Sequence, residues 1–325
     1  MTPYRGRFAP SPTGPLHFGS LIAALGSFCE ARARRGEWLV RLEDLDRPRE
    51  APGAADAILR TLEQFGFEWQ GTVMRQSDRD PAYRLAIETL LSRGALYYCA
   101  CTRKEIADSA ATFASDRAAG GPQESALSGN GERPGGEGQP VERVYPGTCR
   151  GGLPPGRAAR VTRVRVADET ISFCDRVQGN ITQNLERDVG DFVVRRADGL
   201  FAYQLAVVVD DAAQRITEVV RGADLLGSTA RQIYLQRLLG YATPSYAHLP
   251  AAVNARGEKL SKQTRAPALD AAHAVETLIA ALAFLGQSPP QALLRASLRE
   301  LWQWIDENWD LAKAPRLRAR QAPQN

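Results

Sequence analysis

Helical and strand-like patterns alternate along this chain of 325 residues. Apolar residues recur at helical spacing in a stretch that opens near His17, and four later stretches show the same period. Those later stretches are Ala54–Phe65, Pro81–Arg93, Ala272–Leu285 and Gln291–Asn308. Between the first two helices, residues 38–43 (WLVRLE) have the pattern of a short buried strand. The order strand, helix, strand, helix predicts half of a doubly wound parallel sheet.

Three apolar runs later in the chain predict a second half of the sheet. Residues 160–166 (RVTRVRV) alternate, and we expect a strand there that returns to the main domain. Residues 205–211 (LAVVVDD) are almost continuously apolar and end in acids, which is typical of a central parallel strand. Residues 216–240 predict a strand, a turn and a helix, with Arg221 at the carboxyl end of the strand. An arginine at this place also fits an ordinary surface ion pair.

The stretch 7–21 (RFAPSPTGPLHFGSL) predicts a strand end, a sharp turn and a helix start. Its prolines exclude a regular helix across the turn. The N–H groups of Phe18, Gly19 and Ser20 have no partner further back in such a helix, and with the positive helix end they form an anion site that suits phosphate. His17 stands beside that site as a polar donor. The same letters also fit an ordinary strand–turn–helix with a surface histidine.

An acidic cluster follows the first predicted strand. Ligands of open α/β sheets bind at the carboxyl ends of strands, so Glu43, Asp44 and Asp46 are placed to contact one. Glu43 comes directly after the apolar strand, and its carboxylate can pair with a substrate ammonium. Asp44 and Asp46 fit a solvated loop with a helix cap equally well.

A basic loop follows the second predicted half-sheet. In residues 259–263 (KLSKQ), Lys259 and Lys262 flank Ser261 after a glycine, and such a loop can grip phosphates. A solvated basic loop has the same composition.

The five cysteines have an uneven distribution. Cys99 and Cys101 are two residues apart, Cys149 follows Tyr145 by four, and no histidine lies between them. A zinc site normally takes four ligands, so three thiolates need a partner, for which Tyr145 and Cys174 are candidates. Buried free cysteines explain the same pattern, and we expect Cys174 and Cys29 to lie in the core. Residues 109–142, rich in Ala, Gly, Ser, Pro and Glu, predict a disordered surface excursion.

The composition narrows the class of protein. Hydrophobic residues make up 44% and charged residues 24%, as in soluble globular proteins, and no apolar run reaches membrane-spanning length. The first ten residues have no apolar signal core. We therefore expect a cytoplasmic protein without a membrane partner. We also expect a monomer, although nothing in the composition decides the oligomeric state. The net charge of +4 is compatible with a nucleic-acid partner.

Together the motifs resemble the class I aminoacyl-tRNA synthetases of the glutamyl type. Residues 7–19 match the signature RFAPSPTGxLHxG, residues 41–46 match RxEDxD, and residues 259–263 are similar to the KMSKS loop, with Leu260 and Gln263 replacing Met and Ser. HFGS stands where HIGH is common. The resemblance covers nearly the whole chain and implies a Rossmann-type α/β catalytic domain with a parallel sheet, an inserted subdomain and a short helical C-terminal region.

Two features make the chain resemble the glutamyl-Q tRNA(Asp) synthetases, paralogues of the glutamyl enzymes. One is the CxC…YxxxC pattern, and the other is that we expect no anticodon-binding region after the KMSKS-like loop. This resemblance implies one structural Zn²⁺ on Cys99, Cys101, Tyr145 and Cys149, although the spacing is longer than usual. It also implies four regions. They are 1–96 as the first half of the catalytic domain, 97–160 as the zinc-binding insert, 161–240 as the second half, and 241–325 as the KMSKS-like loop with the helical C-terminal region.

The resemblance further implies a reaction and its residues. ATP with Mg²⁺ activates L-glutamate to glutamyl-adenylate without tRNA, and the glutamate passes to queuosine at the wobble position of tRNA(Asp). The implied glutamate-binding residues are Arg7, Phe8, Ala9, Pro10, Ser11, Glu43, Tyr203 and Arg221. The implied ATP-binding residues are His17, Gly19, Ser20, Lys259, Ser261 and Lys262, with His17 and Lys262 catalytic.

Three other functions remain open at this point. A truncated glutamyl-tRNA synthetase that charges the tRNA 3′ end is one. A non-catalytic paralogue that binds amino acid or tRNA is the second, and a nucleotidyltransferase with an HxGx fold is the third.

Overall fold

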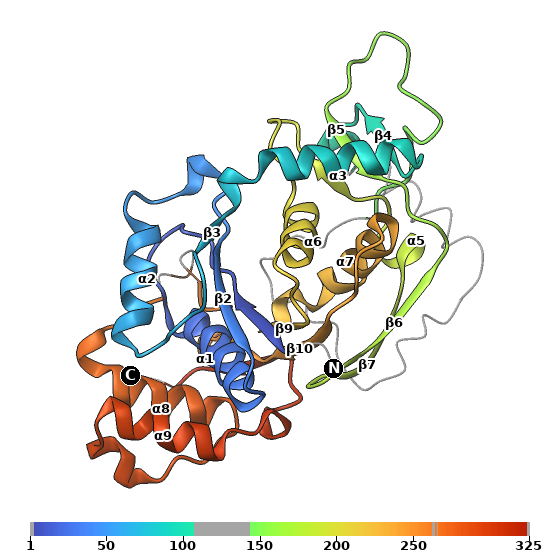
Figure 1. The fold of residues 1–325 in the computed structure, drawn as a ribbon. Coiled ribbons are helices and arrows are strands. Elements are labelled where there is room, and N and C mark those ends of the chain that lie inside the picture. Colours follow the sequence, from blue (N-terminus) through green and yellow to red (C-terminus); the bar gives the residue numbers. More distant parts are fainter. Residues whose placement is uncertain (1–2, 107–143, 262–263, 265, 324–325) are drawn as a thin grey trace.

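Two sets of parallel strands meet at the centre of the molecule (Figure 1). The computed structural model describes residues 3–106, 144–261, 264 and 266–323, so the predicted excursion 109–142 and Lys262 lie outside the described residues. The first set has the order β1 (Arg5–Phe8), β2 (Glu37–Leu42), β3 (Met74–Arg75). The second has β9 (Glu218–Gly222), β10 (Ser245–Leu249), β6 (Thr170–Asp175) and, antiparallel at its edge, β7 (Gly179–Asn184).

The two sets join along β1 and β9. The Thr217 N–H donates to the Arg5 carbonyl at 3.0 Å, and the Arg5 N–H donates to the Thr217 hydroxyl at 2.8 Å. The strand order across the molecule is therefore β3-β2-β1-β9-β10-β6. The chain adds the strands of its first half to one side of β1 and begins the second half on the other side, with β9, so the switch point lies between β1 and β9. In open α/β sheets the ligand site lies at the carboxyl ends of the strands at this switch point.

Helices cover both faces of these strands, because neighbouring strand residues face opposite sides. Val220 and Ala247 point into one core and Val219 and Tyr246 into the other. The first core holds α1 (Phe18–Ala33), α2 (Ala54–Gln64), α8 (Ala274–Phe284) and α9 (Leu298–Asn308). The second holds α3 (Asp80–Ser92), α6 (Tyr203–Ala213) and α7 (Leu226–Leu239). Helix α1 packs tightly on β10, since a Cβ at Gly26 would lie 2.3 Å from Leu249 Cδ1.

The remaining elements are short. A separate antiparallel sheet has the order β4 (Leu96–Cys99), β5 (Val161–Val164), β8 (Val193–Arg195), and β11 (Ala251–Val253) pairs parallel with β12 (Ala319–Gln321). The other helices are α5 (Leu185–Asp188), η1 (Arg47–Arg49), η2 (Gln76–Asp78), η3 (Ala223–Leu225), η4 (Ala271–His273), η5 (Gln291–Arg295) and η6 (Leu311–Lys313). No helix among the described residues is long and apolar enough to cross a membrane.

The structure corrects four sequence predictions. Residues 205–211 are part of helix α6 and not a central strand; both faces of this helix are buried, which removes the helical period from its sequence. Residues 161–164 form the predicted strand, but it pairs with β4 and β8 and not with the main sheet. Cys174 is exposed on β6 near the sheet edge, not in the core, whereas Cys29 is buried as predicted. The helix expected over 291–308 is divided into η5 and α9.

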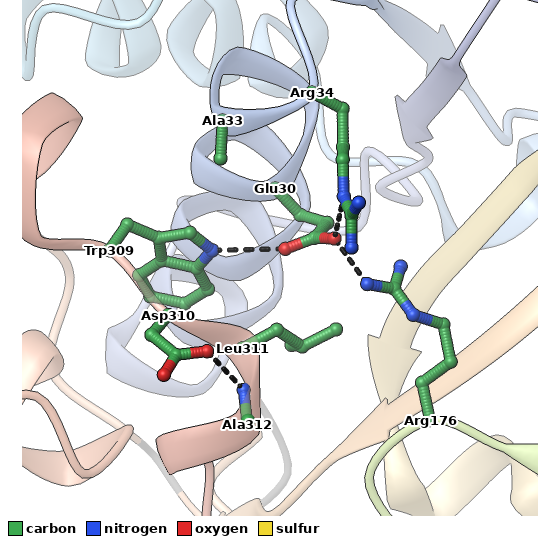
Figure 2. A pocket seen from close by; sticks show the side chains of 8 residues that line it. All are labelled: Glu30, Ala33, Arg34, Arg176, Trp309, Asp310, Leu311 and Ala312. Carbon is green, nitrogen blue, oxygen red and sulfur yellow. Dashed lines mark hydrogen bonds and ion pairs between the residues drawn. The ribbon is translucent and has the colours of Figure 1, made fainter.

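A buried carboxylate joins the C-terminal segment to the main sheet (Figure 2). Glu30, in the last turns of α1, is 2% exposed. It accepts hydrogen bonds from Arg34 at 3.2 Å, from Arg176 after β6 at 2.5 Å, and from the Trp309 indole at 3.2 Å. A cavity of about 450 Å³ lies beside these groups. Of the three donors only Trp309 belongs to the C-terminal segment, so its indole N–H ties that segment to α1 through Glu30, while Arg176 ties the end of β6 to the same carboxylate.

Candidate active site at the switch point

His17 caps the N-terminus of α1 and takes part in a reciprocal capping box. The His17 Nδ1 accepts the Ser20 N–H at 3.3 Å, and the Ser20 hydroxyl accepts the His17 N–H at 3.3 Å. The Ser20 N–H is therefore occupied by His17 and not left for a ligand, contrary to the prediction. Burial and the charge of Lys259 lower the pKa of His17, so its ring is neutral at pH 7. Since Nδ1 accepts, the ring proton lies on Nε2, which remains a donor.

Leu260 and Leu269, on either side of the basic motif, lie against this helix start. A Cβ at Gly19 would be 3.3 Å from the Leu260 carbonyl oxygen and 3.1 Å from His17 Cε1, so the glycine permits the close approach. The Leu269 N–H donates to the Leu16 carbonyl at 2.9 Å. The fold thus brings the two sequence motifs of the predicted nucleotide site together.

Two side chains shape the described part of this loop. The Lys259 ammonium pairs with Asp224, after β9, at 2.5 Å. The Ser261 N–H donates to the Thr264 hydroxyl at 2.9 Å, and that hydroxyl donates to the Lys259 carbonyl at 3.0 Å. Lys259 lies near enough to the helix start for its charge to act on His17, although its ammonium is paired with Asp224. Lys262 lies outside the described residues, and its role stays a prediction.

The predicted amino-acid residues converge around Tyr203, the first residue of α6. Burial raises the pKa of the Tyr203 phenol, and the charges of Arg221, Glu43 and Arg7 all act on it. Arg221 Nη1 lies 3.4 Å from the Tyr203 hydroxyl. These four residues come from β1, the end of β2, α6 and β9, so the switch point assembles them from distant parts of the chain.

The segment 7–11 runs alongside the same group. The Glu43 N–H donates to the Pro10 carbonyl at 2.9 Å, which ties the end of β2 to this segment. The Phe8 ring is in the core, with its centroid 6.2 Å from that of Trp38, so its side chain faces away from the site. Ala9 is partly buried and Ser11 is exposed, as expected for residues that border an open site.

A buried network of charges lies behind these residues. The Asp211 carboxylate accepts from Arg7 Nε at 3.1 Å and from Arg41 Nη1 at 2.7 Å, and Arg41 Nη2 lies 3.4 Å from Glu43. Arg41 has 0% exposure. Burial raises the pKa of the Glu43 carboxyl, while the Arg41 and Arg7 charges oppose that shift. Sequence reasoning missed Arg41 and Asp211, although an arginine inside a strand and paired acids after an apolar run were visible signals.

Asp44 and Asp46 have structural partners. Asp44 accepts the N–H and the hydroxyl of Ser77, both at 2.8 Å, which ties the segment after β2 to η2. Asp46 pairs with Arg49 and with Arg196 at 2.5 and 2.8 Å. Both acids therefore have protein partners, but Asp44 is 3% exposed, so it does not lie in the solvated loop that one interpretation of the sequence expected.

Three cysteines and a tyrosine come together beside the small antiparallel sheet. The sulfurs of Cys99, Cys101 and Cys149 lie within 4.8 Å of one another. The Tyr145 hydroxyl lies 3.3 Å from Cys99 Sγ and 3.4 Å from Cys101 Sγ. Three thiols and one phenol that converge on one point match the four-ligand shell of zinc. The residues present therefore fit a Zn²⁺ ion despite the long spacing in the sequence.

Comparisons with known proteins agree with this geometry. Residues 4–132 and 152–293 match the catalytic domain of the class I tRNA synthetases for E and Q. A protein of Dechloromonas aromatica named glutamyl-Q tRNA(Asp) synthetase is 59% identical over 97% of both chains, and one of Aromatoleum aromaticum with the same name is 56% identical over 99% of this chain and 93% of its own. The crystal structure of a glutamate-tRNA synthetase from Elizabethkingia anophelis superposes with a TM-score of 0.74 at 25% identity, over 98% of this chain and 68% of that one.

The predicted fold class is confirmed, because family, relatives and solved structure agree on a class I synthetase fold with a parallel sheet. The extent of the match to the relatives leaves no large part of either chain unaccounted for. The chain therefore belongs to the glutamyl-Q tRNA(Asp) synthetase family of class I aminoacyl-tRNA synthetases, and it is a ligase.

Proposed function

We propose that this protein activates L-glutamate with ATP and transfers the glutamate to queuosine at the wobble position of tRNA(Asp). The observation that carries the proposal is the meeting of two half-sites at one switch point. The His17 end of α1 with the 259–261 loop suits a nucleotide, and the group around Tyr203 suits a dianionic amino acid. The names of the relatives support glutamate and tRNA(Asp) as the substrates.

In the first step, the α-carboxylate of glutamate attacks the α-phosphorus of ATP and pyrophosphate leaves. No protein nucleophile is needed, so the residues act by positioning the reactants and by stabilising charge. The His17 Nε2–H and the Gly19 N–H at the start of α1 would bind phosphate oxygens, while Lys259 and Lys262 would offset the charge that develops there. Mg²⁺ that arrives with ATP would share this task.

Glutamate would be recognised at its two ends. Arg221 and Arg7 offer guanidinium groups to the side-chain carboxylate, and Glu43 offers its carboxylate to the ammonium. Ser11 and Tyr203 can complete the hydrogen bonds. An arginine pair favours glutamate over glutamine, whose neutral amide does not compensate the two positive charges.

The second step would take place on tRNA. We infer that the four regions 1–96, 97–160, 161–240 and 241–325 divide the chain as the family resemblance implies, and that the Cys99 cluster holds a structural zinc because its four ligands leave no open position for chemistry. Action on tRNA implies a cytoplasmic location.

The experiment has two stages. The first is glutamate-dependent exchange of pyrophosphate into ATP, with and without tRNA, and we expect exchange without tRNA. The second is transfer of labelled glutamate to three substrates: tRNA(Asp) with queuosine, tRNA(Asp) without it, and queuosine-containing tRNA(Asp) that lacks its 3′-terminal adenosine. We expect label on the first and third only.

Other results would favour the rival functions. Label that depends on the terminal adenosine and not on queuosine would identify a shortened glutamyl-tRNA synthetase. Absence of exchange under every condition would favour a binding paralogue.

A further inference from the structure

Three neighbouring strands each place one buried polar residue in a row that ends at Arg221. Arg221 lies on β9, His248 is its register partner on β10, and Asp175 is the last residue of β6. His248 has 0% exposure, and Asp175 and Arg221 have 2% and 4%. Burial of such groups costs free energy unless each is hydrogen-bonded. The partners of the three side chains therefore show what the row holds in place.

Hydrogen bonds decide which nitrogen of His248 carries the proton. Arg221 Nε lies 3.0 Å from His248 Nε2, and because a guanidinium can only donate, Nε2 must be the acceptor. The proton of the neutral ring is then on Nδ1, which donates to Asp175 Oδ2 at 2.5 Å. The other oxygen of Asp175 accepts the N–H groups of Val177, Gln178 and His248, so the carboxylate is held in one orientation.

The protonation state is consistent with this arrangement. Burial lowers the pKa of His248 to about 4, and the Arg221 charge acts in the same direction while Asp175 opposes it. Burial would raise the pKa of Asp175, but its hydrogen bonds from His248 and the backbone outweigh burial and lower it. At pH 7 the histidine is therefore neutral and the aspartate is charged.

One edge of the Arg221 guanidinium is occupied by these neighbours. Nε donates to His248, and Nη2 donates to the Thr229 hydroxyl at 2.9 Å. The Nη1 end lies toward Tyr203 and the candidate amino-acid site. We propose that Asp175 and His248 are positioning residues that fix the Nη1 end of Arg221 where the side-chain carboxylate of the substrate binds. This inference rests on the proposed function, because it takes the substrate to be glutamate.

The Asp175→Asn variant tests the tautomer directly. An asparagine can still accept the three backbone N–H groups through its oxygen, but it then presents an N–H₂ group to His248 Nδ1. His248 Nδ1 must become the acceptor, the proton moves to Nε2, and two donors face each other between His248 and Arg221. We expect the KM for glutamate in pyrophosphate exchange to rise roughly tenfold or more, with the KM for ATP unchanged.

Two substitutions at His248 separate the effect of its hydrogen-bond acceptor, Nε2, from the effect of its packing in the core. His248→Leu removes the acceptor and should raise the KM for glutamate about as much as Asp175→Asn does. His248→Gln can place its side-chain oxygen near the position of Nε2, so it should recover a KM within about threefold of wild type. The matched control is Glu30→Gln, another buried carboxylate that binds arginine, and it should lower thermal stability while leaving both KM values unchanged.

The outcomes separate this inference from the proposed function. If the wild-type protein shows no glutamate-dependent exchange, both are overturned. If the wild type is active but Asp175→Asn and His248→Leu keep its KM for glutamate, and lose only stability or kcat, the pair is structural and this inference alone is wrong. A rise in the KM for glutamate that His248→Gln reverses supports it.

Discussion

Arg41 and Asp211 are 170 positions apart in the sequence, and Arg41 Nη1 donates to Asp211 Oδ1 at 2.7 Å. Arg41 belongs to β2 and Asp211 to α6, so the bond joins the first half of the chain to the second. Asp211 also accepts from Arg7, and Arg41 also reaches Glu43. The same buried charges therefore hold the two halves together and place two of the residues that we expect to bind glutamate.

We predict that Asp211→Asn lowers the free energy of unfolding by about 3–5 kcal/mol, because the buried Arg7 loses its carboxylate partner and Arg41 keeps only Glu43, at 3.4 Å. Denaturant unfolding measures the change. The control Asp306→Asn breaks the half-exposed pair with Arg32 and should cost at most about 1 kcal/mol. Equal, small effects of the two variants would contradict the network.

The Asp211 pair also gives a pH dependence of stability. Burial would raise the pKa of this carboxyl, but Arg7 and Arg41 outweigh burial and hold the pKa below its usual value. A depressed pKa stabilises the folded state fully above the ordinary aspartate value of about 4, and that contribution is lost as the pH falls further. We expect the stability difference between wild type and Asp211→Asn to shrink below about pH 4 and to be constant from pH 5 to 8.

We expect Glu43 to set the acid limit of glutamate binding. Burial raises its pKa, so on acidification it takes up a proton at a higher pH than an exposed glutamate does. Only the carboxylate binds an ammonium. As the pH is lowered, kcat/KM for glutamate should therefore start to fall while the pH is still higher than 4.3, the approximate pKa of a free glutamate side chain. In Glu43→Gln, kcat/KM should be lower throughout and this acid limb should be absent. An unchanged acid limb in the variant would assign it to another group.

His17 caps α1, and we propose that it also binds phosphate; substitution can separate the two roles. His17→Asn supplies a good N-cap for α1 but no donor at the position of Nε2, whereas His17→Ala supplies neither. We expect both variants to slow adenylate formation by roughly 10²- to 10³-fold. Only His17→Ala should also lower the free energy of unfolding, by ~1 kcal/mol, because it removes the N-cap. Calorimetry and pyrophosphate exchange measure the two effects, and an active His17→Asn would show that capping is the sole function of this residue.

Metal analysis tests the cysteine cluster. We expect about one zinc per chain in the purified protein, and Cys99→Ser should lose it together with at least about 4 °C of melting temperature. Tyr145→Phe keeps three thiols and should bind zinc more weakly, so that a chelator removes the metal faster than from the wild type. Cys174→Ser is the control, since this thiol is exposed away from the cluster. Full zinc content in Cys99→Ser would refute the ligand set.

Local patterns in the sequence predicted those parts of the fold that local rules determine. The turn and helix at His17, the strand before Glu43, and the strand and helix around Arg221 lie where the pattern placed them. Helix α6 was misread because burial on both faces removes the amphipathic signal that separates a helix from a strand. The short strands β3, β11 and β12 were missed because they depend on pairing partners far along the chain.

The predicted site shows the same division. Motifs marked the residues that we propose to face the substrates, such as Glu43 and Tyr203. The residues behind them, Arg41, Asp211 and His248, became visible only when the fold brought their partners within hydrogen-bonding distance. Their chemistry is non-local, since a buried arginine or histidine is informative only together with the group that it contacts.

The pairing of β12 with β11 has a practical consequence. Strand β12 pairs with β11 along residues 319–321, the Ala322 N–H donates to the Val253 carbonyl, and β11 leads into the loop that carries Lys259. A tail that is cleaved or fused to an affinity tag next to β12 would disturb β11, from which that loop begins. Tag placement is therefore an experimental variable in any kinetic comparison of this enzyme, and a protein tagged at the other end is the safer reference.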